Sequence, residues 1–165
     1  MRAAYSLLTV ASLLLVCPFA LADQPPVDRD VEMALCKGAN TQYDVTQCAG
    51  DVYEAADKEL NAAYQAVLKK WANYPDVTGK LRQAQRDWLT YRDADVEARF
   101  AFEDSEGAMR GTAYPAAYAF YRASLARERT ARLCQYLRGT AYGEVDRSAC
   151  TDLVKHPYVI PAPTH

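Results

Sequence analysis

Apolar residues recur every three or four positions through three long stretches of this sequence, and this spacing restricts the fold most strongly. The stretches cover residues 41–71, 76–105 and 114–137, and each period places the apolar residues on one face of a helix. No stretch alternates with a period of two, so we expect no sheet. Three long amphipathic helices joined by short breaks predict an all-α fold, an up-down antiparallel bundle of three long helices.

The breaks between the stretches contain residues that start or stop helices. Asn40 or Thr41 is expected to cap the first helix and Asp76 the second, while Gly139 ends the third. Short helices are expected near both ends, around residues 31–36 and 145–154. The predicted core-facing residues of the first helix are Tyr53, Ala56, Leu60, Tyr64, Val67 and Trp71; of the second, Val77, Leu81, Ala84, Trp88, Tyr91 and Val96 or Phe100; of the third, Tyr118, Tyr121, Leu125, Leu133 and Leu137.

The N-terminus has the pattern of a secretory signal peptide over residues 1–22. Arg2 is followed by an apolar run that is shorter than a membrane span needs, and Ala20-Leu21-Ala22 resembles a cleavage site. The alternatives are a membrane anchor and a lipoprotein linked through Cys17. We expect cleavage after Ala22, a single helical domain over residues 23–155 without stable membrane insertion, and a proline-rich tail over residues 156–165.

Four cysteines remain after the predicted cleavage, Cys36, Cys48, Cys134 and Cys150. In an exported chain, four cysteines usually form two disulfides, and three pairings are possible. Proximity in sequence favours Cys36–Cys48 and Cys134–Cys150. The alternative, a zinc site with four cysteine ligands, lacks the usual CxxC spacing.

The sequence shows no sign of enzyme chemistry. Both histidines, His156 and His165, lie in the predicted tail, where a general base would be poorly positioned. The common nucleophile, metal-protease and nucleotide-binding motifs are absent from the sequence. We therefore predict a protein that is not an enzyme and has no cofactor and no metal, with a hydrolase using paired carboxylates as an alternative. A net charge of −2 gives no indication of nucleic-acid binding.

Charge is distributed unevenly between the second and third predicted helices. Residues 87–106 contain seven acidic and two basic side chains, whereas residues 107–138 contain six basic and one acidic. One interpretation is that these neighbouring segments pair with each other. The other is that the acidic segment steers a basic protein partner. The residues that would then contact the partner are Asp87, Asp93, Asp95, Glu97, Glu103 and Asp104.

Two motifs resemble those of a known family. Residues 57–64, DKELNAAY, resemble its D-x-x-L-N-x-x-Y signature, and residues 85–94, QRDWLTYRDA, resemble its Q-x-x-W-x-x-Y-R-D-A signature. Both are similar to the LprI-type lysozyme-inhibitor family of exported bacterial proteins, and Glu128-Arg129-Thr130 resembles a late element of that family. The motif residues carried over are Asp57, Leu60, Asn61, Tyr64, Gln85, Trp88, Tyr91, Arg92 and Asp93.

The resemblance implies an all-helical binding protein of the periplasm or the cell exterior, which inhibits a muramidase such as lysozyme by protein–protein contact. The alternative is a helical adaptor of the envelope with another partner and no action on lysozyme. The polar motif residues are expected to hold the helices in register through one network, rather than to touch a partner. The chain also departs from the family, which usually has cysteines near Val96 and near Tyr121. Their joint absence is consistent with the loss of one disulfide.

Overall fold

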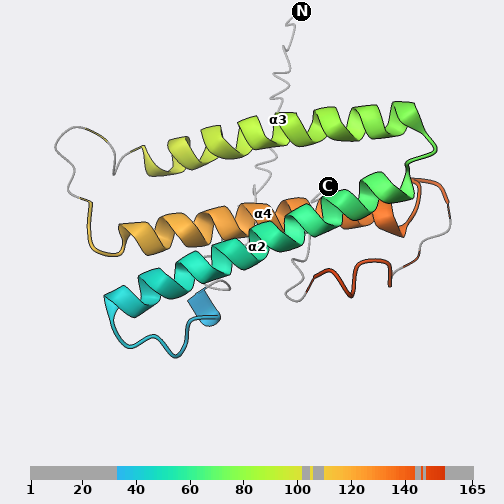
Figure 1. Cartoon of the computed structure of the whole chain (residues 1–165). Helices are drawn as coiled ribbons and strands as arrows, with labels where there is room; N and C mark the ends of the chain where they lie inside the picture. The colour runs from blue at the N-terminus through green and yellow to red at the C-terminus, as the bar shows by residue number, and fades with distance from the viewer. Residues whose placement is uncertain (1–32, 102–104, 106–109, 144–145, 147, 155–165) are drawn as a thin grey trace, which may run out of the picture.

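Three long helices make up the fold in the computed structural model, which describes residues 33–101, 105, 110–143, 146 and 148–154 (Figure 1). They are α2 (Gln42–Lys70), α3 (Pro75–Phe100) and α4 (Tyr114–Arg138). No strand occurs among these described residues, and the predicted all-α class is confirmed. The predicted signal peptide (1–22) and tail (156–165) lie outside the described residues, as do Glu103, Asp104 and both histidines.

Local chemistry accounts for where each helix begins and ends. Thr41 caps α2 through a reciprocal pair of hydrogen bonds with Asp44, each 3.1 Å long. The prediction that Asp76 caps α3 was wrong. The helix begins one residue earlier at Pro75, which needs no partner for an N–H, and Asp76 lies in the first turn. α4 ends before Gly139, whose φ of 156° glycine adopts readily and residues with a Cβ atom rarely do.

Both predicted terminal helices differ from the structure among the described residues. Near the N-terminus, Met33 and Ala34 are helical and turns follow them. Near the C-terminus, residues 148–153 form successive turns in place of the expected helix, closed by bonds such as the 3.0 Å one from the Thr151 N–H to the Ser148 carbonyl. α3 also stops at Phe100, short of the predicted end at residue 105.

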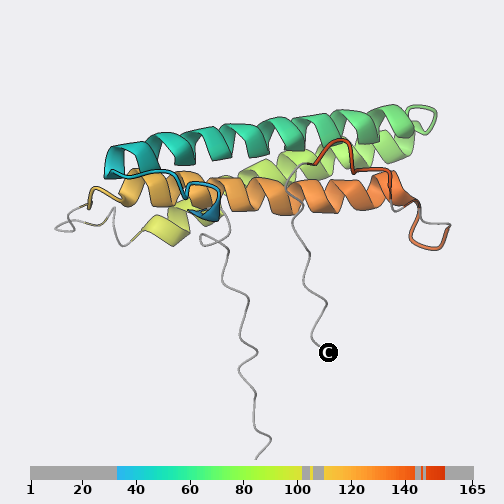
Figure 2. The same cartoon turned by 90° about the horizontal axis from the view of Figure 1, so that it is seen from below.

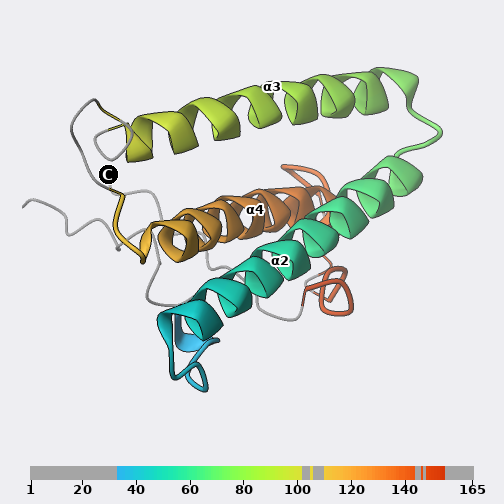
Figure 3. The same cartoon turned by 60° about the vertical axis from the view of Figure 1, so that its left-hand side comes forward.

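Helices that are adjacent in sequence run antiparallel, which confirms the up-down order (Figures 1 and 2). As a result, α2 and α4 run parallel to each other. The side-chain bonds that join them confirm this direction, because they link residues at nearly constant separations of 65 to 68 along the chain. These two parallel helices approach closely along most of their length, whereas α3 approaches α4 closely at only a few positions (Figure 3).

Small residues form the interface between α2 and α4. Six alanines in these helices have 0–3 % of their surface exposed, and they allow the two backbones to lie close together. Larger apolar residues such as Leu60 and Leu133 fill the remaining space. By contrast, the predicted core residues Tyr53, Tyr64 and Trp71 are only half-buried at the edge of this core. The six alanines are Ala49, Ala56, Ala63, Ala116, Ala123 and Ala126.

Two disulfides staple the ends of the bundle. Cys36 pairs with Cys48 at a Cα–Cα distance of 5.9 Å, and Cys134 pairs with Cys150 at 5.7 Å. This confirms the pairing favoured by sequence proximity, and the zinc interpretation was wrong because the sulfurs are bonded to each other. Disulfides indicate a chain that matures in an oxidising compartment. Among the residues that the structure describes, no helix has the length and apolar character required to cross a membrane.

Candidate partner-binding surface

The outer side of α3 carries three of the predicted acidic contact residues, Asp87, Asp93 and Glu97, all exposed. Asp87 accepts a 2.7 Å hydrogen bond from the Gln83 amide one turn earlier. Asp93 forms a 2.7 Å ion pair with its neighbour Arg92. Because both interactions stay within α3, the three carboxylates remain on the surface. Together they form what we call the acidic face, which covers about a third of the helix circumference from Asp93 and Glu97 round to Asp87.

Asp95 does not belong to the acidic face. In a helix of 3.6 residues per turn, it points to nearly the opposite side from Asp93. Its carboxylate accepts hydrogen bonds from the Tyr121 hydroxyl of α4 at 2.6 Å and from the Tyr91 hydroxyl at 3.3 Å. Burial, together with this bond to Asp95, raises the pKa of Tyr121 well above its usual range, and the pKa of Tyr91 is raised for the same reasons. Asp95 therefore links α3 to α4.

Within the part of the chain that the structure describes, three arginines of α4 make contacts other than the expected pairing with the acids of α3. Arg127 forms a buried ion pair with Glu59 of α2 at 3.1 Å. Arg122 lies over the ring of Tyr53 with its guanidinium carbon 4.3 Å from the ring centre. Arg129 donates a 3.0 Å hydrogen bond to the Gln85 amide oxygen. Arg127 and Arg122 therefore contact α2, and Arg129 contacts an uncharged amide of α3. None of these contacts neutralises a carboxylate of the acidic face.

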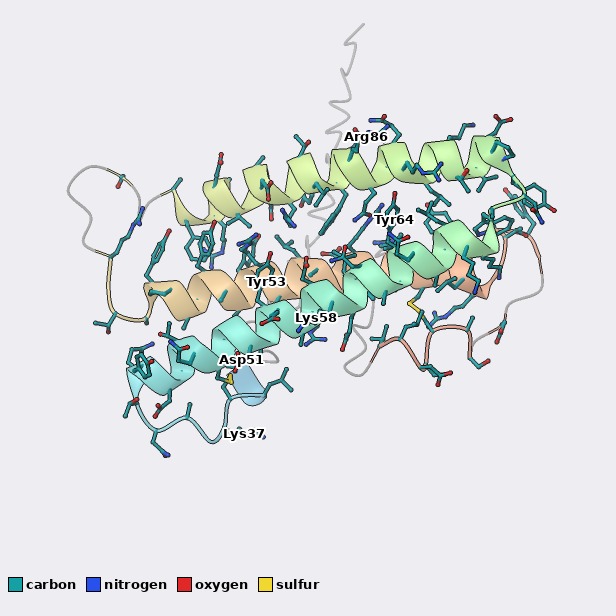
Figure 4. The ribbon with its side chains drawn as sticks, in the orientation of Figure 1. Lys37, Asp51, Tyr53, Lys58, Tyr64 and Arg86 are labelled. Atoms are coloured by element: carbon teal, nitrogen blue, oxygen red, sulfur yellow. A yellow bond between two sulfur atoms is a disulfide. The ribbon has the colours of Figure 1, made fainter. Side chains whose placement is uncertain are left out.

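The first family motif lies in the middle of α2, and its polar members bond within that helix. The Asn61 amide donates to the Asp57 carboxylate at 2.9 Å, four residues away on an exposed side. Leu60 is buried in the core with 2 % of its surface exposed, and Tyr64 is half-buried on the side of α2 that faces α3 (Figure 4). This motif therefore supplies core packing and a local bond, and among the described residues Asp57 and Asn61 bond to each other within α2.

The residue that sequence reasoning missed in this motif is Glu59. Its side chain is buried, with 8 % exposed, and it forms the ion pair with Arg127 that joins α2 to α4. A signal was present in the sequence, because Glu59 is adjacent to Leu60 and falls on the same inner side of the helical period. An acidic residue at such a position requires a basic partner, and Arg127 precedes the Glu128-Arg129-Thr130 element.

The second family motif faces α4 around Trp88. Gln85 is buried and holds Arg129, while Arg129 and Arg92 place their guanidinium carbons 5.8 Å and 5.4 Å from the centre of the Trp88 ring. Burial lowers the pKa of Arg129. The prediction that Tyr91 faces the core was wrong, because 57 % of its surface is exposed and its hydroxyl bonds to Asp95. Among the motif's polar residues, Gln85 reaches another helix, whereas Arg92 and Asp93 pair locally.

The two positions where family members usually have cysteines come together in the structure. Val96 of α3 is buried with Phe100 and Leu125, and Tyr121 of α4 packs against this group. The ring of Phe100 also meets Tyr121 edge-on with 5.8 Å between the ring centres. An apolar contact and the Asp95–Tyr121 hydrogen bond thus occupy the place where the resemblance implies a disulfide between α3 and α4.

Comparison with known proteins identifies relatives of this chain. The family model described as "Lysozyme inhibitor LprI" matches residues 34–133. An uncharacterized protein of Rhizobium meliloti (strain 1021) is 37% identical over 134 residues, which cover 74% of this chain and 88% of the relative. No solved structure matches the chain. Since the family model spans both motifs, the whole of α2 and α3 and most of α4, the chain belongs to the lysozyme inhibitor LprI family.

Proposed function

We propose that this protein is exported by its first 22 residues to the periplasm or the cell exterior, where it binds and inhibits a muramidase of the lysozyme type. It acts by protein–protein contact, without catalysis or a cofactor. The family membership and the two disulfides support a binding protein that matures outside the cytoplasm. The predicted signal peptide supplies the route.

The acidic face of α3 carries this proposal. Asp87, Asp93 and Glu97 are exposed on one rigid helix, and the arginines described on α4 are engaged elsewhere. Lysozymes of the animal type are strongly basic, so their surface potential is opposite in sign to that of this face. Complementary potentials accelerate encounter and fix orientation more than they add affinity. The acidic face is therefore proposed to guide a basic muramidase onto α3.

Exposed tyrosine and leucine side chains supply a second part of the contact. Tyr91 and Leu89 are both on α3, with 57 % and 38 % of their surfaces exposed. Tyr91 follows Asp87 by four residues and Leu89 precedes Asp93 by four, so each lies beside an acidic residue on the helix surface. Tyrosine is enriched among residues that contribute most to protein–protein binding. We propose that charge steers the partner and that Tyr91 contributes to holding it.

The test is a titration of lysozyme activity on bacterial cell walls with the mature, oxidised protein at low and at physiological ionic strength. We expect inhibition that saturates and weakens as salt is added, because exposed charges are screened over about 8 Å at physiological salt. The decisive variant is Asp87→Lys/Glu97→Lys. Its matched control is Asp51→Lys/Glu54→Lys, which makes the same change in net charge on α2, where both residues are also exposed.

The two variants separate a specific face from general attraction. Loss of inhibition in the α3 variant alone supports the acidic face as the docking surface. Equal loss in both variants would show that only net charge matters. No inhibition at a large excess of folded protein would contradict the proposal, and capture of another envelope protein would then support the adaptor alternative.

A further inference from the structure

The two ends of the bundle carry opposite net charge. This separation arises because folding brings together halves of different helices, so no one helix shows it in full. Basic residues lie in the second half of α2 and the first half of α3, and because these helices are antiparallel, both halves meet at the turn between them. The end of α4 joins them there because α4 runs parallel to α2 (Figure 1). We call this region, residues 69–82 together with 132–146, the turn end.

The turn end is basic. Its described residues include six basic and two acidic side chains, whereas residues 42–59, 87–100 and 114–127 in the opposite half contain nine acidic and five basic. All six basic residues are exposed: Lys69, Lys70, Lys80, Arg82, Arg132 and Arg138. Lys70 donates a hydrogen bond to the Leu137 carbonyl in the last turn of α4, which offsets the negative end of that helix.

Aromatic side chains accompany these cations. Three tyrosines of the turn end, Tyr74, Tyr136 and Tyr142, have 57 %, 43 % and 103 % of their surfaces exposed. Half-buried Trp71 holds this end together, since its indole N–H donates to the Tyr136 carbonyl at 3.2 Å and its ring meets that of Tyr74 edge-on at 5.7 Å. The rings of Trp71 and Tyr74 are therefore held against each other before any partner arrives.

We propose that the turn end docks on the surface of an anionic phospholipid membrane. Tyrosine and tryptophan favour the headgroup region of a bilayer, and lysine and arginine are attracted to anionic headgroups. The two features coincide at one end of an elongated molecule, so docking there is peripheral and inserts no helix. Docked in this way, the protein directs its acidic half away from the membrane. This inference does not depend on muramidase inhibition.

The experiment is co-sedimentation of the mature, oxidised protein with two sets of vesicles, phosphatidylcholine alone and phosphatidylcholine with about one third phosphatidylglycerol. We expect binding to the anionic vesicles at low ionic strength, release as salt is added, and no binding to the neutral vesicles. The variant is Lys69→Gln/Arg138→Gln, which leaves the Lys70 bond intact. Each cation contributes about fivefold to binding at such a surface, so the partition coefficient should fall about thirtyfold.

The matched control is Lys37→Gln/Lys58→Gln, which removes two exposed cations from the other half of the molecule (Figure 4). It should bind anionic vesicles as the parent protein does, and circular dichroism should show both variants folded. Equal loss in the two variants would overturn the proposal, as would binding to both vesicle types or to neither. A last measurement tests binding to a soluble polyphosphate instead of vesicles. Binding to it without binding to anionic vesicles would also overturn membrane docking, in favour of a soluble polyanion.

Discussion

The two interfaces of α4 are built in different ways. On one side, α4 meets α2 through alanines that are almost completely buried, and the buried ion pair Glu59–Arg127 crosses the contact. On the other side, α4 meets α3 through long side chains, among them Gln85, Arg129 and Tyr121, with aromatic rings between them. The first interface is close and apolar, and the second is wider and combines polar contacts with a small apolar cluster of Val96, Phe100 and Leu125.

This difference assigns separate roles to the helices. Close packing of small residues gives a rigid pair, since any added volume must displace a backbone. An interface of hydrogen bonds and stacked rings is more exposed to water, and each bond contributes less. We therefore expect α2 and α4 to form the stable frame and α3 to be the helix that opens first. The acidic face lies on α3, the element whose position is most readily adjusted by a partner.

The largest effect is expected from breaking the buried ion pair. Glu59→Ala leaves Arg127 charged within the frame, and it should lower the free energy of unfolding by about 3–5 kcal/mol. Chemical denaturation under oxidising conditions measures this. Glu59→Leu combined with Arg127→Met should recover most of the loss, whereas Glu54→Ala, which removes an exposed carboxylate of the same helix, should change little. A small effect of Glu59→Ala would show that the frame tolerates a lone charge.

The second largest effect is expected from widening the close contact between α2 and α4. Ala123 is fully buried between α2 and α4, so Ala123→Leu should force the helices apart and lower the free energy of unfolding by about 1–3 kcal/mol. The matched control is Ala94→Leu on the exposed side of α3, which should be nearly neutral. Thermal denaturation of both variants provides the comparison. Equal stability of the two would contradict a difference in packing between the interfaces.

The bond between α3 and α4 should give a smaller effect that depends on pH. Burial and the hydrogen bond to Asp95 raise the pKa of Tyr121 above its unfolded value of about 10, so folding favours the neutral phenol. This stabilisation is complete below about pH 10 and is lost as the pH rises above it. Tyr121→Phe should cost about 1 kcal/mol at neutral pH. Because phenylalanine does not ionise, the gap between the two proteins should narrow in alkaline solution.

Hydrogen exchange adds the spatial readout for this variant. The amides of α3 should exchange faster than those of α2 and α4 in the parent protein, and Tyr121→Phe should accelerate α3 further while leaving the frame unchanged. Uniform exchange across the three helices would show that they open together. That result would remove the distinction between frame and adjustable helix.

The smallest effect is expected within the first family motif. Asn61→Ala removes an exposed bond to Asp57 inside α2 and also introduces a better helix former, so the stability should change by no more than about 0.5 kcal/mol. Denaturation and lysozyme inhibition should be measured on the same preparation. Unchanged stability with lost inhibition would assign Asn61 a role in binding, and would contradict our expectation that the motif is structural.

Much of the fold could be predicted because it depends on local chemistry. Thr41 with Asp44, and Gly139, mark helix ends by hydrogen bonds and backbone conformations that neighbouring residues determine. The core face of α2 was predicted less well. Large residues such as Tyr53 and Trp71 lie at the edge of the core, and buried alanines form its centre. Which small residues face a neighbour depends on which helices touch. The closest pair, α2 and α4, is separated in sequence by the whole of α3.

The candidate surface could be predicted only in part, for a related reason. The acidic segment was visible, but the position of Asp95 against Tyr121 follows from the packing of two helices that lie 26 residues apart at this contact. Likewise, the sequence did not determine which residues pair with the α4 arginines. The structure pairs Arg127 with Glu59 and Arg129 with Gln85. Composition gives the number of charges, and tertiary packing decides which of them remain available to a partner.

The disulfides have a consequence for how the chain acquires its native bonds. Each bridge joins cysteines that follow one another in sequence, 12 and 16 residues apart. Closing a short loop costs less entropy than closing a long one. If Cys17 leaves with the predicted signal peptide, the native pairs are therefore also the first that can form as the chain emerges with its N-terminus first. An oxidase alone should therefore give the correct bonds, and the protein should mature without the help of a disulfide isomerase.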